Sequence, residues 1–322
     1  MAGQGSATRG HARARRGFAW GLLVVSLLAL ASTDILALDP SRSLGQYNSR
    51  TWRRADQLPA NLVSALAQGA DGHLWLGTTR GLVYFDGLDF KAVGLPGQDD
   101  AKPRIVTALA PRAAGGLWVG TERGGCGLWD GRTFTPLEHS VVNQRQSTVT
   151  SLHESRQGAL VIGARDLVVR LPANGPEQVI SQVGEVQSVH EDATGRIWIG
   201  TREHGLLCWQ DGQTATVGGA AAELWGRHTI HDIVVDPDGL IWVAADNGLH
   251  CLAPDLSPRP PVGLTMQINC LTVDRHGALL IGTLFDGLYR YYEGRLSHLA
   301  RRDGLASDQG PVAQIARVIE RR

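Results

Sequence analysis

The stretch Gly72-His-Leu-Trp-Leu-Gly-Thr-Thr-Arg-Gly-Leu-Val-Tyr-Phe-Asp-Gly87 guides the interpretation of the whole chain. Its four glycines separate short runs of β-branched and aromatic residues, and no helical periodicity follows them. A phosphate-binding loop would instead place clustered glycines between a strand and a helix. The stretch therefore predicts short strands joined by turns rather than a ligand loop.

Five further copies of this stretch follow along the chain. Aligned on the second glycine, or on the alanine that replaces it, the copies are 43, 43, 37, 44 and 38 residues apart, at Gly77, Gly120, Gly163, Gly200, Ala244 and Gly282. A period of about 40 residues with several short strands per unit is the signature of propeller blades. The sequence therefore predicts an all-β fold, a β-propeller of four-stranded blades.

Each unit is interpreted as four strands, which in the first copy cover residues 62–68, 73–77, 81–85 and 89–93. One tryptophan recurs in the second strand of four copies. A large aromatic side chain provides buried area that an isolated four-stranded sheet lacks. We therefore expect these tryptophans to pack between neighbouring blades: Trp75, Trp118, Trp198 and Trp242.

The two ends of the repeat region predict a seventh blade that is unfinished. Residues 46–52 match an outer strand without a blade of its own, and residues 312–318 match a new inner strand. Pairing of first and last strands normally removes the exposed edges of a propeller. Six complete repeats plus an incomplete seventh favour a truncated gene product or a fragment of a longer sensor.

The repeat resembles that of the two-component regulator propeller (Reg_prop) family over roughly residues 44–311. Three segments carry the resemblance: residues 58–66, 72–78 and 81–90. The third copy departs from the pattern because it lacks the tryptophan, and the fifth has Ala244-Ala245 in place of Gly-Thr. The resemblance implies a periplasmic ligand-binding sensor domain of bacterial histidine kinases, hybrid sensors or diguanylate cyclases, which continue into a membrane helix and an output domain.

The N-terminus has the order of a secretory signal. Four arginines precede an apolar run over residues 18–31 that ends in small residues. The sequence predicts a signal peptide over residues 1–31 with cleavage after Ala31, or alternatively after Ala37, and a propeller sensor domain over residues 44–322 in the periplasm. An uncleaved membrane anchor is the competing interpretation, although the run is shorter than the roughly 20 apolar residues that span a membrane.

The charge composition bears on nucleic-acid binding, and the cysteine positions bear on disulfide formation. The chain has 31 basic and 31 acidic residues, so no excess of positive charge favours nucleic acid. Cys208 and Cys251 hold equivalent positions in adjacent repeats, too far apart for a disulfide bond. The four cysteines are therefore expected to be buried thiols.

The loops between the second and third strands carry a charged residue in every copy. We expect them to surround one mouth of the central channel and to bind a small polar ligand, such as an oligosaccharide. Trp225 and Phe285 lie on or near loops outside the tryptophan register and could stack on a sugar ring, although burial is expected for both. The candidate ligand-binding residues are Arg80, Arg123, Arg165, Arg202, His204, Trp225, Asp246, Asn247, Phe285 and Asp286.

Patterns suited to catalysis or metal binding are weak. His228 and His231 are three residues apart on an expected strand, where they would point to opposite faces. Asp192 and Asp236 begin segments of the composition that tight turns require. No catalytic residue, metal site or cofactor is predicted.

The sequence as a whole favours a non-enzymatic, extracytoplasmic ligand-sensing propeller of a two-component or diguanylate cyclase type signalling protein. Its partners would be the ligand and a second copy or a membrane-bound signalling protein. A propeller lyase or hydrolase acting on glycans and a periplasmic scaffold protein are the alternatives. The choice relies on analogy at the level of the fold.

The basic and apolar N-terminus generates a prediction about export. The mature protein should begin near Ser32 or Leu38 and appear in the periplasmic fraction, because signal peptidase removes the segment before it. N-terminal sequencing of the fractionated protein measures this. Membrane-bound protein that retains residues 18–31 would contradict cleavage.

Overall fold

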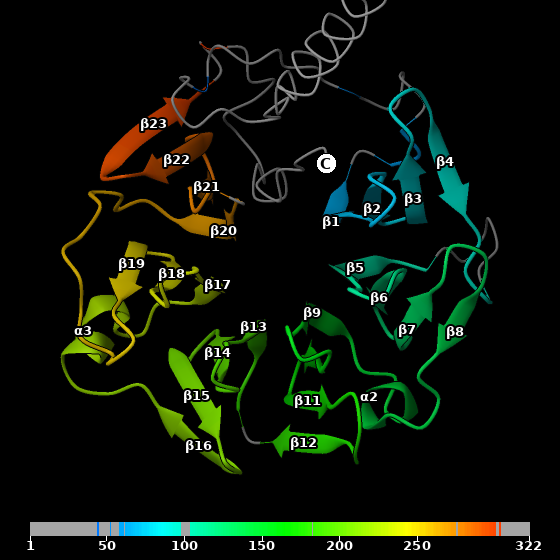
Figure 1. The fold of residues 1–322 in the computed structure, drawn as a ribbon, viewed down its shortest axis with the longest axis horizontal. Helices are drawn as coiled ribbons and strands as arrows, with labels where there is room; N and C mark the ends of the chain where they lie inside the picture. The colour runs from blue at the N-terminus through cyan, green and yellow to red at the C-terminus, as the bar shows by residue number, and fades with distance from the viewer. Residues whose placement is uncertain are drawn as a thin grey trace, which may run out of the picture. The chain divides into compact units, whose positions relative to one another are not determined.

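Each copy of the sequence repeat folds into its own antiparallel β-sheet, giving six sheets in the described residues. The computed structural model describes residues 62–97, 104–181, 183–274 and 276–300, together with Leu44, Trp52, residues 58–60 and Asp303. Within the unit formed by residues 40–322, the sheets follow one another around a central axis (Figure 1). The predicted all-β propeller is confirmed.

The strands follow the repeat closely. Blades one and two contain β1 (Val63–Gln68), β2 (Leu74–Thr78), β3 (Gly81–Phe85), β4 (Phe90–Val93), β5 (Val106–Pro111), β6 (Leu117–Thr121), β7 (Gly125–Trp129) and β8 (Phe134–Pro136). Blades three and four contain β9 (Val149–Glu154), β10 (Leu160–Ala164), β11 (Leu167–Leu171), β12 (Gln178–Ser181), β13 (Val186–Glu191), β14 (Ile197–Thr201), β15 (Leu206–Gln210) and β16 (Gln213–Thr216). Blades five and six contain β17 (Ile230–Val235), β18 (Ile241–Ala245), β19 (Gly248–Leu252), β20 (Ile268–Val273), β21 (Leu279–Thr283), β22 (Leu288–Tyr292) and β23 (Arg295–Leu299).

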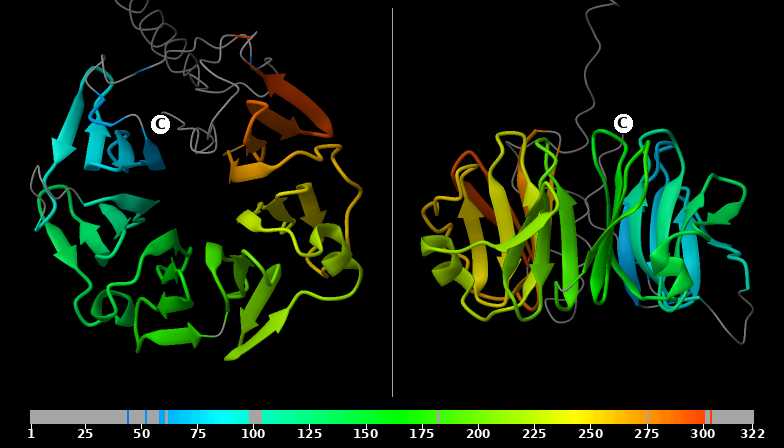
Figure 2. Two further views of the ribbon diagram at one scale, coloured as in Figure 1. Left: turned by 180° about the vertical axis from the view of Figure 1, so that it is seen from behind. Right: turned by 90° about the horizontal axis from the view of Figure 1, so that it is seen from below.

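Strands pair in chain order within every sheet, so each blade is an up-and-down meander. The first strand of each blade lies nearest to the axis and the last lies at the rim, as Figures 1 and 2 show from both sides. Each of these inner strands contacts the inner strand of the next blade, from β1 through β5, β9, β13 and β17 to β20. The inner strands therefore surround the axis.

The fifth blade departs from the four strands predicted. Among the described residues its sheet has three strands, and only an isolated bridge joins Leu252 to Pro258 where an outer strand would pair. Pro258, Pro260 and Pro261 follow β19 within a few residues, and proline has no N–H to donate to a strand ladder. The prolines account for the missing outer strand.

Two short helices, α2 (Val141–Gln144) and α3 (Ala220–Trp225), lie in connections between blades. None of the helices in the described ranges is long and apolar enough to cross a membrane. The predicted signal sequence and the predicted strands at 46–52 and 312–318 lie outside the described residues, apart from Trp52. That side chain packs against Phe85 and Phe90, with ring centroids 5.2 and 6.1 Å away.

All four cysteines are free thiols, as predicted. Cys126 and Cys251 are buried, and burial raises the pKa of these thiols to about 12 and about 11. Cys208 and Cys270 are only partly buried, which corrects the expectation that all four would be inaccessible. Cys270 is partly exposed because its strand borders the central pocket described below.

Glycine in the second strand allows close contact between consecutive blades at several junctions. A Cβ placed on Gly120 would lie 2.4 Å from Cγ1 of Val149, the first residue of the next inner strand. The same test places a Cβ on Gly200 2.8 Å from Cγ2 of Ile230. Real side chains do not approach so closely, so glycine lets the inner strand of the next blade pack directly on the backbone.

The tryptophans of the repeat pack between blades, as predicted. Trp198 is fully buried in a cluster with Ile230 and Ile233 of the following inner strand. Its indole N–H donates to Oδ2 of Asp192 at 3.0 Å. Asp192 lies in the turn before β14 and also accepts backbone N–H groups there, so one carboxylate holds both the turn and the tryptophan.

The burial of Trp198 generates a prediction about stability. Trp198→Ala should lower the free energy of unfolding by about 3–5 kcal/mol, because it removes a fully buried aromatic side chain between blades four and five. Phe285→Ala is the matched control, since Phe285 is 64% exposed and its loss should change stability by less than about 0.5 kcal/mol. Urea unfolding of both variants measures the difference. Equal effects would show that Trp198 does not hold the blades together.

Candidate functional site

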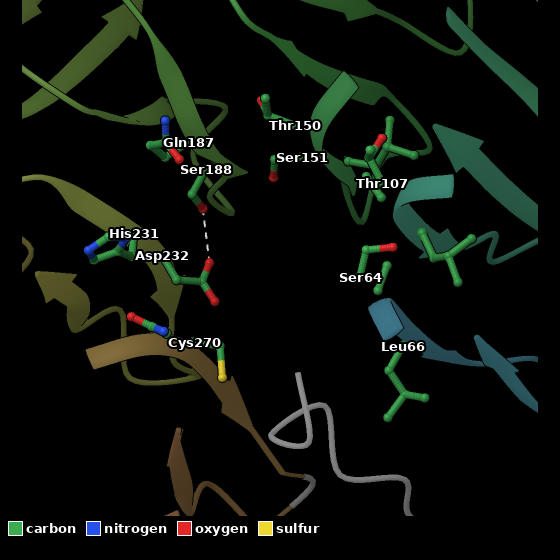
Figure 3. A pocket seen from close by; sticks show the side chains of 15 residues that line it. Ser64, Leu66, Thr107, Thr150, Ser151, Gln187, Ser188, His231, Asp232 and Cys270 are labelled. Atoms are coloured by element: carbon green, nitrogen blue, oxygen red, sulfur yellow. Dashed lines mark hydrogen bonds between the residues drawn. The ribbon is translucent and has the colours of Figure 1, made fainter. Parts of the chain in front are cut away.

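A cavity of about 210 Å³ lies among the inner strands of the six blades. Figure 3 shows side chains from opposite blades pointing toward this common space. Three consecutive residues of the inner strand line it in the first three blades, and two do so in each of the others. The lining residues are Ser64, Ala65, Leu66, Thr107, Ala108, Leu109, Thr150, Ser151, Leu152, Gln187, Ser188, His231, Asp232, Asn269 and Cys270.

A β-bulge at the second residue of every inner strand produces this lining. The first and third residues pair with the second strand, while the second residue has no partner opposite it. Bulges redirect side chains and often occur beside functional sites. All six bulged residues are polar, and we call them the bulge ring: Ser64, Thr107, Thr150, Gln187, His231 and Asn269.

Hydroxyl groups of the bulge ring bind the backbone of the blades in two cases. The Ser64 hydroxyl donates to the carbonyl oxygens of Gly77, in its own blade, and Val106, in the next. The Thr150 hydroxyl donates to the carbonyl of Gly163 at 3.2 Å. The Oγ1 atom of Thr107 is buried and has no hydrogen-bond partner among the described residues.

Asp232 is the carboxylate of the pocket wall, and it joins three blades. Its Oδ1 accepts the hydroxyl proton of Ser188 in blade four and the N–H of Ile233 in its own blade, each at 2.9 Å. Its Oδ2 accepts the N–H of Leu271 in blade six, also at 2.9 Å. These bonds fix the carboxylate at the pocket surface between blades four and six.

His231 connects the pocket with one of the loops predicted to bind ligand. Its Nε2 lies 2.6 Å from Oδ1 of Asp246, and the Asp246 Oδ2 accepts the N–H of Thr229. Partial burial acts to raise the pKa of Asp246, but the hydrogen bonds from His231 and Thr229 outweigh it and lower that pKa. Asp246 is therefore ionised at neutral pH.

The amide of Gln267 extends this network to Asn269 of the bulge ring. Its Nε2 donates to Oδ1 of Asn269 at 3.0 Å and lies 3.3 Å from the His231 ring nitrogen. The polar groups of blades five and six therefore hold one another in place beside the pocket. A preorganised wall of this kind costs little entropy to use in binding.

The ten candidate residues from the sequence lie outside the pocket lining. Asp246 contacts that lining through His231. The following predicted residues are exposed on the loops: Arg80, Arg123, Arg165, Arg202 and His204. Asn247 is bonded to Leu224 and His250, and Asp286 to Tyr289 and His298.

The two aromatic candidates have opposite environments. Trp225 is buried on α3, as expected, and packs against Leu206 and Ile230. Phe285 is exposed, so the expectation of burial was wrong for it. The turn that carries it is held by the Asp286 N–H, which donates to Thr283 Oγ1 at 2.8 Å, and this arrangement leaves the neighbouring ring in solvent.

Sequence analysis missed the bulge ring, although the sequence contains a signal for it. Each inner strand begins with valine or isoleucine followed at once by a polar residue, at Val63-Ser64, Val106-Thr107, Val149-Thr150, Val186-Gln187, Ile230-His231 and Ile268-Asn269. In two blades this polar residue hydrogen-bonds the backbone of the blades, and in all six it lines the pocket. An alignment of the six inner strands would have revealed this column.

Comparisons with known proteins support the architecture. The sequence has no match among curated proteins. The fold is similar to the extracellular domain of the hybrid two component system BT3049 from B. thetaiotaomicron, with a TM-score of 0.66 and 18% identity over 81% of this chain and 38% of that one. It is also similar to virginiamycin B lyase from Staphylococcus aureus bound to Quinupristin, with a TM-score of 0.60 and 11% identity over 73% of this chain and 83% of that one.

These similarities concern the fold, because the identities are low, and the chain spans well under half of the B. thetaiotaomicron domain. A direct match at the level of sequence comes from a family model. The model described as "Two component regulator propeller" matches residues 57–80 and 182–203, in the first and fourth repeats. The resemblance inferred from the repeats is thereby confirmed: the first and fourth repeats match the two component regulator propeller model.

Proposed function

We propose that this propeller is an extracytoplasmic ligand-sensing module of a bacterial signalling protein, and that the ligand binds in the central pocket. The observation that carries the proposal is the bulge ring. Six polar residues from the same position of six repeats line one cavity, while the residue before each of them packs between blades. Concave sites with a few fixed polar groups are typical of small-ligand binding.

The similarity to extracellular domains of two component systems supports the sensor role and a location outside the cytoplasm. In the proposed function the protein is periplasmic and the ligand is a small polar molecule such as an oligosaccharide. Binding would favour one arrangement of a homodimer or of a membrane-bound signalling partner. The loop residues predicted from the sequence, Asp246 above all, would contact the part of the ligand that leaves the pocket.

An enzymatic role is the second candidate, and one observation favours it. His231 belongs to the pocket lining, and its imidazole is held by the carboxylate of Asp246 at 2.6 Å. A histidine oriented by a carboxylate is a common general base. The propeller fold is shared with virginiamycin B lyase. Binding without turnover is the outcome that the sensor proposal requires.

A matched pair of substitutions tests whether the ligand binds in the pocket. Gln187→Leu removes a polar group of the bulge ring, and Gln213→Leu makes the same change on the exposed outer strand β16. Thermal-shift screening of mono- and oligosaccharides and polar amines, followed by calorimetry, identifies a ligand for the wild-type protein. That ligand should raise the melting temperature of Gln213→Leu as it does the wild type, and should bind Gln187→Leu at least about tenfold more weakly, because a lost buried hydrogen bond costs about 1–3 kcal/mol.

Unchanged affinity in Gln187→Leu would place the ligand elsewhere and contradict the proposal. Chemical conversion of the ligand by the wild-type protein, abolished in His231→Ala, would favour the enzymatic role instead. Analysis of the incubated ligand by mass spectrometry distinguishes binding from conversion.

A further inference from the structure

The outer strands of the blades differ in how their free edges are protected. An outer strand pairs with its own blade on one side only, so its other edge presents N–H and C=O groups that can pair with a further strand. Proteins commonly protect such edges with charged residues or proline. The outer strands in the described residues are β4, β8, β12, β16 and β23, and they lie at the rim of the ring of blades (Figure 1).

Four of these five strands carry protection of this kind. β4 contains Lys91, and β23 begins with Arg295. β8 ends in Pro136, and Pro176 and Glu177 come directly before β12. The exception is β16, the outer strand of blade four.

β16 has neither a charged residue nor a proline. Its sequence is Gln213-Thr-Ala-Thr216, and the sequence contains no charged residue and no proline from Gly212 to Ala222. All four residues of β16 are exposed, which holds for no other outer strand in the described ranges. Threonine also favours the extended conformation of a strand. The edge of β16 is therefore accessible and ready to pair.

The register between β15 and β16 determines which backbone groups face outward. The N–H of Val217, just after β16, donates to the carbonyl of Leu206 at 2.9 Å, so the backbone of Val217 points toward β15. These groups alternate in direction along a strand, and the register continues without a shift through β16. Ala215 therefore bonds to β15 as well, whereas Thr214 and Thr216 direct their N–H and C=O groups away from the blade.

This edge is complementary to itself. When two copies of β16 pair antiparallel about a twofold axis at Ala215, Thr214 of each copy lies opposite Thr216 of the other, and each such pair exchanges both of its N–H···O bonds. Ala215 then lies opposite its own counterpart, in the type of pair in which side chains approach most closely. Threonine pairs across strands are favourable, and an uncharged strand avoids the repulsion that like charges would meet there.

We propose that β16 is a homodimer interface, at which blade four pairs edge to edge with blade four of a second copy of this chain. The two four-stranded sheets then form one continuous sheet across the twofold axis. The contact is short, so the dimer is weak and reversible, with a dissociation constant on the order of 10–100 µM. The inference goes beyond the proposed function, because it assigns the surface through which two copies associate and does not depend on ligand binding.

Opposite charges placed at Ala215 test this interface. Sedimentation equilibrium of the full chain, over concentrations that bracket the expected dissociation constant, should show a reversible monomer–dimer equilibrium. Ala215→Lys and Ala215→Glu should each weaken association about fivefold or more, because each variant places like charges opposite one another at the axis. An equimolar mixture of the two variants should restore association, because lysine then lies opposite glutamate.

Ala92→Lys and Ala92→Glu are the matched controls, since Ala92 is exposed on the outer strand β4 of blade one. These variants and their mixture should associate as the wild type does. Thermal melting of every variant checks the fold. If the Ala215 variants fail to fold, Thr216→Pro removes an outward N–H that the pairing with β15 does not use, and it should abolish the dimer.

A wild-type chain that stays monomeric throughout would overturn the inference. A dimer with the same dissociation constant in Ala215→Lys, or a mixture of charged variants that associates no better than either alone, would also overturn it, because association would then use another surface. None of these results changes the expectation for ligand binding in the pocket, which Gln187→Leu tests separately.

Discussion

The contact between the glycine of one blade and the valine or isoleucine that begins the next inner strand is the constraint on which the rest of the structure depends. At Gly77, Gly120 and Gly200, an added Cβ would lie 2.4–2.8 Å from the β-branched residue of the following blade. Backbone and side chain therefore pack without a gap at this level of the propeller. In the blades that have it, the tryptophan of the second strand packs in the same interface, as Trp75 and Trp198 do.

The central pocket follows from this contact. The first residue of the inner strand faces the previous blade and the third returns to the ladder, so the bulge leaves the second residue unpaired in the wall of the pocket. The residue before the bulge is valine or isoleucine in all six strands, whereas the bulged residue varies from serine to histidine. Function can thus vary by substitution in the bulge ring without altering the contacts that hold the blades together.

The sequence predicted the fold well because its signals are periodic. Six copies of a glycine-bounded strand pair indicate the number of blades, and the tryptophan register identifies their interfaces. The three-stranded fifth blade was not predicted, although Pro258, Pro260 and Pro261 were a signal against an outer strand there. Of the candidate ligand-binding residues, Asp246 is the one linked to the pocket, through its hydrogen bond to His231.

The pocket lining was harder to predict because it depends on the pairing register between the first and second strands of each blade. Sequence analysis selected the loops because charged residues are concentrated there. In the structure, charged loop residues such as Arg123 and Arg165 are exposed. A bulge becomes visible only when the pairing of two strands is known, and it redirects one side chain by breaking the alternation on which sequence interpretation relies. The Asp232 carboxylate joins three blades, and no local pattern reveals bonds across such distances along the chain.

A double-mutant cycle at Gly120 and Val149 tests the central claim most directly. The φ of Gly120 is not positive, so alanine there introduces no backbone strain, only a methyl group against Val149. Gly120→Ala alone should cost about 1–3 kcal/mol of unfolding free energy, as overpacked interiors do. Adding Val149→Ala removes the closer contact, with Cγ1 at 2.4 Å, and leaves the one with Cβ at 2.8 Å, so the double variant should be more stable than the sum of the single effects by at least about 0.5–1 kcal/mol. Strictly additive effects would contradict the claim that this contact holds consecutive blades together.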